Sequence, residues 1–178
     1  MILHLFFDDK FADYAIQQFQ EIDGSSYFVV VLDNETEIKH IKQTDKIELV
    51  VFNSTEYHDL LMHLSAYSAI VVHGLFFPWQ EQIILSAPEN IKIAWVCWGG
   101  EIYSRKELLS HFLERQTKWI YWKKQIKRII RLKTLIGKEF FVNKKTFQRI
   151  DFCLSDMPEE YEYVKHFCKS SMEYLWYN

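Results

Sequence analysis

The stretch IAWVCWGGEIYS, residues 93–104, joins a buried-strand pattern to an unusual ending. Its apolar run ends at Trp98, and Gly99, Gly100 and Glu101 follow. A short, continuously apolar run is typical of a strand in a sheet that is covered on both faces. Glycine adopts backbone conformations that other residues avoid, so it allows the chain to approach a ligand closely. The stretch therefore predicts a buried strand that ends at a ligand site.

Similar apolar runs alternate with helical patterns along the chain. Strands that alternate with helices are typical of βαβ units and a parallel sheet. We therefore predict a Rossmann-like α/β fold, a parallel sheet with helices on both faces, as a single domain over residues 1–178. The expected strands are residues 1–7, 25–33, 47–52, 68–76, 91–98, 151–156 and 172–178.

Helices are expected between these strands. Residues 10–22 place Phe11, Ala15, Phe19 and Ile22 on one helical face. Capping residues and early prolines mark where several helices begin. The further helices are expected after the cap Asn53 with Glu56 as its partner, from Pro78 to about residue 85, over 104–136, and after the cap Asp156 before Pro158.

The composition fits one domain with a substantial core, because 49% of the 178 residues are hydrophobic. The three cysteines, Cys97, Cys153 and Cys168, show no close pairing, so we expect reduced thiols in a cytosolic protein. The first residues lack the basic segment and cleavage site of a signal peptide. No apolar run reaches the ~18 residues of a membrane-spanning helix. We therefore expect a protein that is soluble or lies on a membrane without crossing it.

Polar residues and glycines follow four of the expected strands. Because parallel strands end at the same edge of a sheet, these residues would line one ligand-binding edge. Each also has a structural explanation: the glycines as turn residues, the aspartates as helix caps and the histidine as a hydrogen-bonded core residue. The candidates are Asp8 and Asp9, His73 and Gly74, Gly99, Gly100 and Glu101, and Ser155 and Asp156.

Several motifs of cofactor and metal sites are missing from the sequence. It contains neither GxGxxG nor GxxxxGK[ST], which argues against a dinucleotide site or a P-loop, and it has no GxSxG nucleophile elbow. No cysteine pair has zinc spacing, and the separation of His58 and His63 does not place them on one helical face. We therefore expect no bound metal and no cofactor.

The chain as a whole has a net charge of −3, but one segment is strongly basic. The window from Lys118 to Arg149 holds 11 of the 21 basic residues and a single acid, Glu139. Its pattern predicts an amphipathic helix over 118–141 with tryptophans on the apolar face and cations opposite. Packed on the sheet, the apolar face would be core, whereas exposed it would lie on anionic lipid. Nucleic acid is disfavoured, because stacking aromatics would line a groove instead of sharing the apolar face. The membrane-binding candidates are Trp119, Trp122, Lys123, Lys124, Lys127, Arg128 and Arg131.

Four short motifs and the order of the expected elements resemble a bacterial enzyme family. The motifs are ILHLFFDD (2–9), VVHGLF (71–76), WVCWGGEIY (95–103) and FCLSD (152–156). The third is the most specific, a W-G-[GA]-[DE]-[IL]-Y box after a strand. In these features the chain is similar to the N-terminal half of the TDP-N-acetylfucosamine:lipid II N-acetylfucosaminyltransferases, also called 4-alpha-L-fucosyltransferases.

This resemblance implies a glycosyltransferase of the hexosyltransferase type with GT-B architecture, in which this chain is the acceptor-side domain. The family's C-terminal domain, which binds the TDP-sugar donor, would be absent from this chain, so the fragment alone is expected to be inactive. The acceptor is a polyprenyl-diphosphate-linked saccharide at the cytoplasmic face of the bacterial inner membrane. The implied process is surface polysaccharide synthesis of the enterobacterial common antigen type, by a peripheral membrane enzyme without a bound metal.

The resemblance also implies roles for the strand-end residues. A carboxylate or a histidine would orient or deprotonate the acceptor hydroxyl, with Glu101, Asp9 and His73 as the candidates. The alternative function is a non-enzymatic α/β module that binds an anionic membrane or a protein partner. The acceptor-binding candidates are Asp8, Gly74, Trp98, Gly99, Gly100 and Tyr103.

Overall fold

The chain forms two compact units, one of Met1–Trp98 with Val142–Asn178 and the other of Gly99–Phe141. The first unit contains the sheet, and the second contributes the short helix α4, Gly100–Tyr103. The long helix predicted over 104–136 lies outside the described residues apart from Trp119. The computed structural model describes residues 1–22, 24–33, 38–103, 119 and 144–177.

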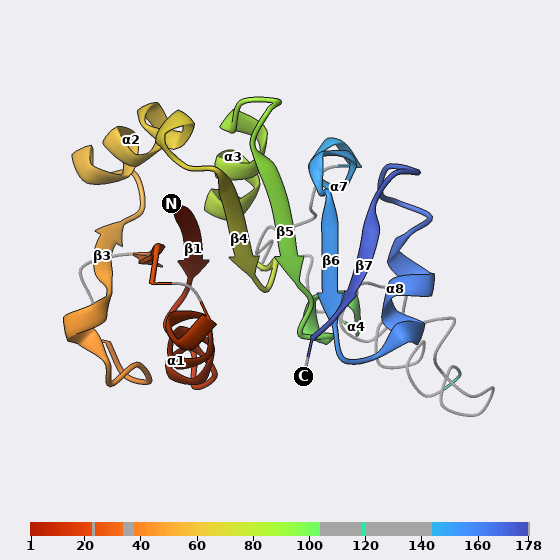
Figure 1. The fold of residues 1–178 in the computed structure, drawn as a ribbon, viewed down its shortest axis with the longest axis horizontal. Helices are drawn as coiled ribbons and strands as arrows, with labels where there is room; N and C mark the ends of the chain where they lie inside the picture. The colour runs from red at the N-terminus through yellow and green to blue at the C-terminus, as the bar shows by residue number, and fades with distance from the viewer. Residues whose placement is uncertain (23, 34–37, 104–118, 120–143, 178) are drawn as a thin grey trace. The chain divides into compact units, whose positions relative to one another are not determined.

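The first unit is built on a sheet of seven parallel strands, so the predicted Rossmann-like α/β fold is confirmed (Figure 1). The strand order is β3-β2-β1-β4-β5-β6-β7, which begins with the Rossmann order 3-2-1-4-5-6. Each strand coincides with a predicted apolar run. The strands are β1 (Ile2–Phe6), β2 (Ser26–Leu32), β3 (Glu48–Val51), β4 (Ala69–His73), β5 (Lys92–Val96), β6 (Phe152–Ser155) and β7 (Glu173–Trp176).

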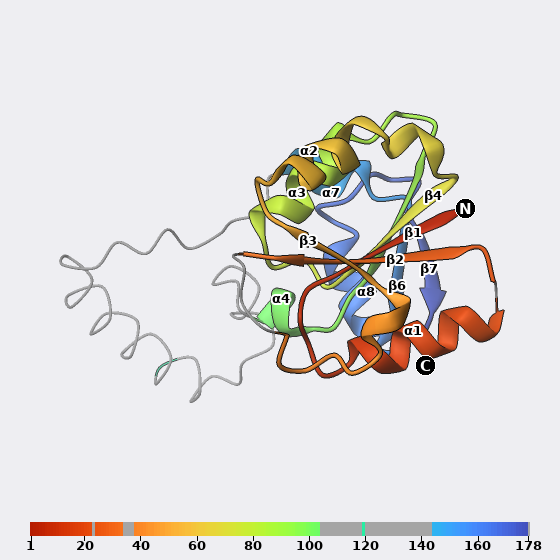
Figure 2. The same cartoon turned by 90° about the vertical axis from the view of Figure 1, so that its left-hand side faces the viewer.

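Helices cover both faces of this sheet, as predicted. Figure 2 shows α1 on one face and α2, α3 and α7 on the other. The strand order runs in one direction from β1 to β3 and in the opposite direction from β4 onward. Because crossover connections between parallel strands are right-handed as a rule, this reversal places helices on both faces. The helix α7 before β6 was not predicted. The helices are α1 (Ala12–Ile22), α2 (Thr55–Met62), α3 (Pro78–Ser86), α7 (Lys144–Arg149) and α8 (Pro158–Val164), with 3-10 turns at Thr44–Lys46 and Leu64–Ala66.

Alternate residues of each strand pack on opposite faces of the sheet. On one face, Phe6 and Phe28 pack with Ala15 of α1. On the other face, the rings of Trp95 and Phe147 of α7 lie with their centroids 5.8 Å apart. Because both faces are covered, the central strands read as near-continuous apolar runs.

The buried stripe of α1 differs from the predicted face. Phe11 and Ile22 are 54% and 74% exposed, whereas Ala12 and Ala15 are buried and Phe19 packs partly against the core. Phe11 and Ile22 lie at the two ends of the helix, where helical spacing does not show whether the sheet still covers the side chain. The predicted apolar face is therefore not covered at either end of α1, and the exposed Phe11 is available to a ligand.

Two predicted helix caps were also wrong. The N-cap of α2 is Ser54, whose Oγ accepts a hydrogen bond from the Tyr57 N–H at 3.2 Å, while Asn53 adopts a φ of 64° in the preceding turn. The N-cap of α8 is Met157, and Asp156 lies one residue earlier. In both places the turn from strand to helix takes one more residue than expected.

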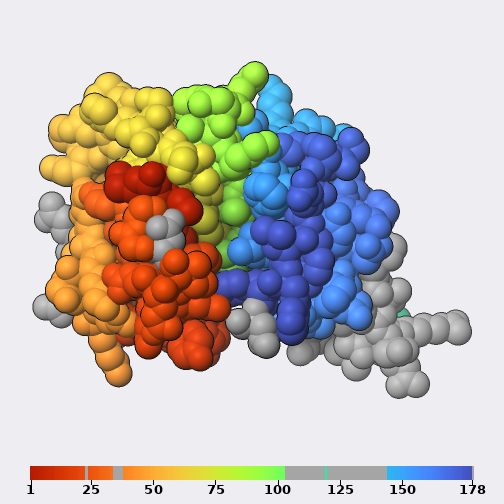
Figure 3. Space-filling model, viewed as in Figure 1, coloured from red at the N-terminus to blue at the C-terminus, as the bar shows by residue number. Residues whose placement is uncertain are grey.

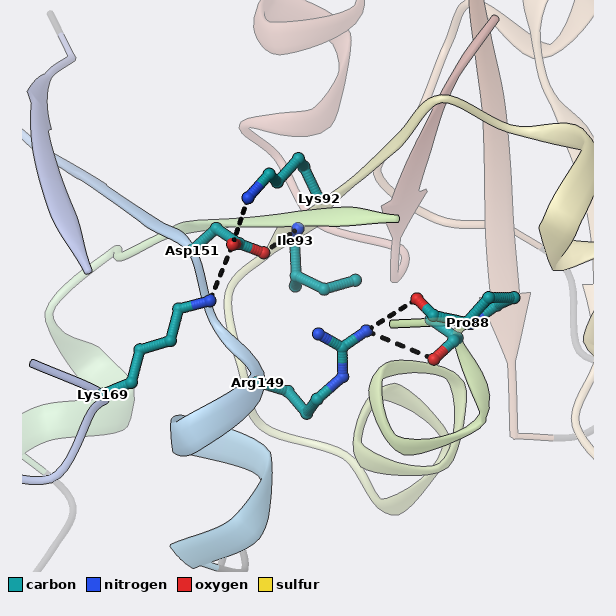
Figure 4. Close-up of polar contacts among 7 residues, drawn as sticks. Pro88, Lys92, Ile93, Arg149, Asp151 and Lys169 are labelled. Atoms are coloured by element: carbon teal, nitrogen blue, oxygen red, sulfur yellow. Dashed lines mark hydrogen bonds and ion pairs between the residues drawn. The ribbon is translucent and has the colours of Figure 1, made fainter. Parts of the chain in front are cut away.

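At the amino edge of the sheet, where the strands begin, Asp151 organises a polar cluster (Figure 4). Its carboxylate accepts hydrogen bonds from the Lys92 and Lys169 ammonium groups at 3.0 and 2.7 Å, and from the Ile93 N–H at 2.9 Å. Arg149 donates to two backbone carbonyls of the turn before β5. Burial acts to raise the pKa of Asp151. The hydrogen bonds from Lys169, Ile93 and Lys92 outweigh burial and hold this pKa below its usual value.

Candidate functional site

The carboxyl edge of the sheet, where the strands end, is the edge at which open parallel sheets bind ligands. The chain leaves β1 for α1 on one face and leaves β4 for α3 on the other. The neighbouring ends of β1 and β4 therefore form the topological switch point, beside which a crevice is expected.

The first cavity at this edge has a volume of about 300 Å³. It lies between α1 and the ends of β5, β6 and β7, and Figure 3 shows the atoms of β5 recessed between α1 and β7. The cavity brings together segments from the two ends of the chain. It is lined by Phe11, Tyr14 and Ala15 at the start of α1, Cys97 and Trp98 after β5, Asp156 after β6 and Tyr177 after β7.

Aromatic rings form most of the wall of the first cavity. Phe11 and Trp98 are in contact with ring centroids 5.9 Å apart, and Tyr14 is 76% exposed. Asp156 is exposed and makes no hydrogen bond or ion pair within the described residues. A sugar ring fits such a wall, because its C–H face packs on aromatic rings and its hydroxyl groups donate to a carboxylate.

Two buried side chains, Ser155 and Glu160, fix the turn that carries Asp156. The Ser155 hydroxyl donates to Glu160 Oε2 at 2.6 Å and accepts from the Met157 N–H at 3.1 Å. The Cys97 thiol donates to the same Glu160 oxygen at 3.7 Å. This cluster ties the ends of β5 and β6 to α8, so the core of the protein sets the position of Asp156.

Gly74 follows β4 with a φ of 71°, in the left-handed region. A Cβ at this position would lie 2.6 Å from the Phe76 ring and 3.3 Å from the Phe7 ring. The fully buried Gln80 secures the turn, because its Nε2 donates to the Gly74 carbonyl and its Oε1 accepts from the Phe76 and Phe77 N–H groups. Because Gly74 has no side chain, the Phe7 and Phe76 rings can lie close to its backbone.

Asp8 and Asp9 follow β1, and both carboxylates accept backbone hydrogen bonds. Asp8 accepts from the N–H groups of residues 39–41, at 2.7, 2.9 and 3.2 Å. Burial acts to raise the pKa of Asp8, but these donors outweigh it and hold the pKa below its usual value. Asp9 Oδ1 accepts from the Phe11 N–H at 2.9 Å in the turn that begins α1.

His73 ends β4 and is fully buried. Its Nε2 lies 3.2 Å from His4 Nδ1, and its ring stacks on Phe6 with centroids 3.9 Å apart. Its Nδ1 has no hydrogen-bond partner within the described part of the chain. Burial, and then the neighbouring His4, hold the pKa of His73 well below its usual value, so the ring is neutral at pH 7. The structure thus places His73 in the core behind the carboxyl edge, and its role in acceptor chemistry stays a prediction.

The predicted site residues after Trp98 belong to the second unit. Gly99 adopts a φ of 79°, and its carbonyl accepts the Ile102 N–H at 2.9 Å. Gly100 begins α4 and Tyr103 ends it, and Glu101 within it is 4% exposed. The roles predicted for Gly99, Gly100, Glu101 and Tyr103 stay predictions.

The membrane-binding candidates fall almost wholly outside the described residues. Trp119 is described, and 62% of its surface is exposed. A search of the described helices finds none with the length and apolar character needed to cross a bilayer. The candidates outside the described residues are Trp122, Lys123, Lys124, Lys127, Arg128 and Arg131.

Five residues of the first cavity were missed as site residues: the aromatic Phe11, Tyr14 and Tyr177, and the smaller Ala15 and Cys97. Phe11 was placed on one helical face with Ala15, Phe19 and Ile22, and Tyr177 was taken as part of the last strand. One signal could have found Tyr177: an aromatic residue directly after a parallel strand lies at the carboxyl edge. No comparable signal marks Tyr14, because it lines the cavity only through the packing of α1 near Tyr177.

Across the described ranges, no cluster of three or more histidine, cysteine or acidic residues could hold a metal ion. Comparison of the sequence with protein-family models and with curated proteins gives no match. The function is therefore inferred from the residues at the carboxyl edge of the sheet.

Proposed function

We propose that this chain is the acceptor-binding domain of a membrane-associated glycosyltransferase. The enzyme would transfer an amino-deoxy sugar of the N-acetylfucosamine type from a TDP-sugar, held by a second domain, to a polyprenyl-diphosphate-linked saccharide. One observation carries the proposal: an aromatic cavity opens at the ligand-binding edge of a Rossmann-like sheet and contains a carboxylate that no described residue pairs with. The resemblance of four sequence motifs to such transferases supports the same function.

The saccharide of the acceptor would bind in the first cavity. Trp98 and Tyr177 supply apolar surface for the C–H face of a sugar ring, and Asp156 accepts a hydrogen bond from a ring hydroxyl. Because the Ser155–Glu160 cluster holds the Asp156 turn, little conformational freedom is lost when the sugar binds.

In the reaction, the acceptor hydroxyl oxygen attacks the anomeric carbon of the donor, whose bond to the diphosphate breaks, and the hydroxyl proton passes to a base. Glu101, Asp9 and His73 are the candidates for orienting or deprotonating that hydroxyl. His73 would need to become accessible for this role, because it is fully buried. The basic segment would hold the enzyme at the anionic cytoplasmic face of the inner membrane, near its lipid-linked acceptor.

Saccharide binding tests this proposal. Titration of the purified chain with N-acetylglucosamine is expected to change the fluorescence of Trp98, which lines the cavity. Asp156→Asn should weaken binding by about 10-fold or more, because it removes a hydrogen bond to a charged acceptor. Glu159→Gln is the matched control, since Glu159 is an exposed acid of the same region that does not line the cavity. An equal loss of affinity in the two variants, or no binding by the wild type, would contradict the proposal.

A further inference from the structure

A second cavity, of about 250 Å³, opens at the carboxyl edge beside the ends of β1 and β2. It is separate from the first cavity, which lies at the ends of β5, β6 and β7. Its walls come from the residues after β1, the end of β2 and the start of α3. They are Phe7, Asp8, Val31, Leu32, Asp33, Phe77 and Trp79.

The second cavity combines aromatic rings with a carboxylate, as the first does. The rings of Phe77 and Trp79 are stacked, with centroids 6.0 Å apart and planes 9° apart, and Phe7 packs edge-on against Phe77 at 5.1 Å. Asp33 is exposed and has no hydrogen bond or ion pair with any described residue. Asp8, by contrast, is occupied by three backbone N–H donors, so Asp33 is the carboxylate that can accept from a ligand.

The ring of Phe7 links the two cavities. Phe7 lines the second cavity and Trp98 lines the first, and their centroids lie 5.4 Å apart. Two successive ring contacts, of 5.4 and 5.1 Å, thus connect Trp98 to Phe77 through Phe7. Within the first unit, an aromatic track runs along the carboxyl edge from Phe11 to Phe77, and the buried Trp79 ring stacks behind Phe77.

The turn after β4 supports this track. The missing side chain at Gly74 leaves room for the Phe7 and Phe76 rings, and Gln80 fixes the turn from inside the core. The turn that supports the track is therefore fixed by the buried Gln80 side chain, and such preorganisation lowers the cost of binding a ligand.

We infer that the second cavity is a binding subsite for a further sugar ring of the saccharide held in the first cavity, because Phe7 and Trp98 join two cavities that each combine aromatic rings with a carboxylate that has no partner among the described residues. The subsite would take an uncharged, polyhydroxylated ring, with the C–H face on Phe77 and a hydroxyl group donating to Asp33. The inference rests on the proposed function and extends it, since it makes the preferred ligand a saccharide of at least two rings.

Calorimetric titration with N-acetylglucosamine and with its β1,4-linked dimer tests the inference. We expect the dimer to bind about 10-fold more tightly than the monomer, which is the value of one further hydrogen bond to a charged acceptor. Asp33→Asn should remove this advantage and leave the affinity for the monomer unchanged. Asp156→Asn should weaken both ligands. Asp45→Asn, an exposed acid outside both cavities, is the control and should change neither affinity.

The outcomes separate this inference from the proposed function. Equal affinity for monomer and dimer, with binding still dependent on Asp156, would overturn the second subsite and leave the proposed function standing. No binding of either saccharide would overturn both. Adenosine is titrated in parallel. Adenosine binding that is tighter than dimer binding and is lost in Asp33→Asn would assign the second cavity to a nucleoside and overturn the inference.

Discussion

The two edges of the sheet use aspartates in opposite ways. At the amino edge, Asp151 is 7% exposed and accepts hydrogen bonds from two ammonium groups and a backbone N–H. At the carboxyl edge, Asp33 and Asp156 are exposed in cavities and make no such bonds within the described residues. Hydrogen bonds that are formed inside the protein stabilise the fold, whereas unpaired groups in a cavity remain available to a ligand.

The largest effect is expected from Asp151→Ala at the amino edge. The change removes the acceptor of the Ile93 N–H and leaves two ammonium groups without their partner, so we expect a loss of about 3 kcal/mol in the free energy of unfolding. Urea denaturation measures this loss. Asp156→Ala at the carboxyl edge is the control, and its unfolding free energy should stay within about 0.5 kcal/mol of the wild type. Equal losses in the two variants would remove the distinction between the edges.

Gly74→Ala is expected to show that part of the carboxyl edge is also structural. The new Cβ would meet the Phe76 ring in a backbone conformation with a φ of 71°, so we expect a loss of about 2 kcal/mol in unfolding free energy. Gly24→Ala is the matched control, because nothing lies within 4 Å of the position that its Cβ would take. A melting temperature of Gly74→Ala equal to that of the control would contradict the steric argument.

A smaller effect is expected from pH, and the two edges should respond in different ranges. Because His73 has a depressed pKa, the unfolded chain binds a proton below its usual pKa of about 6.5 while the folded protein does not. Stability should therefore fall by up to about 1.4 kcal/mol between pH 7.5 and 5.5. Asp151 also has a depressed pKa, but it is an acid, so its contribution is lost only as pH falls below about 3.9.

Urea denaturation at several pH values measures both responses. His73→Phe, which keeps a ring beside Phe6 but cannot titrate, should show a smaller change between pH 7.5 and 5.5 than the wild type. If the wild type and this variant changed equally, the buried imidazole would not be the group responsible.

The sequence predicts the sheet well because its signal is local. Each strand is an apolar run, and Asp8, His73, Gly74 and Asp156 were placed at strand ends by that pattern alone. The contacts of these residues are not local, and the sequence does not predict them. Asp8 binds the backbone of residues 39–41, which lie far along the chain.

The cavities were not predicted because they depend on packing between distant elements. The first cavity needs Tyr177, which follows β7, to lie beside α1, and these segments come from opposite ends of the chain. The second needs Phe7 and Phe77 to meet across the switch point. Helical spacing likewise placed Phe11 on one face with Ala15 and Phe19, but the pattern does not show where the sheet stops covering α1.

The division of the first unit into two chain segments has a consequence for folding during synthesis. β5 pairs with β6, yet Gly99–Phe141 is made between them, so the ribosome must complete this stretch before β6 can add to the sheet. At ~5–20 residues per second, β5 waits for a period on the order of several seconds. During that interval, the apolar strand Lys92–Val96 is an unpaired sheet edge, open to association with other nascent chains until its neighbour arrives.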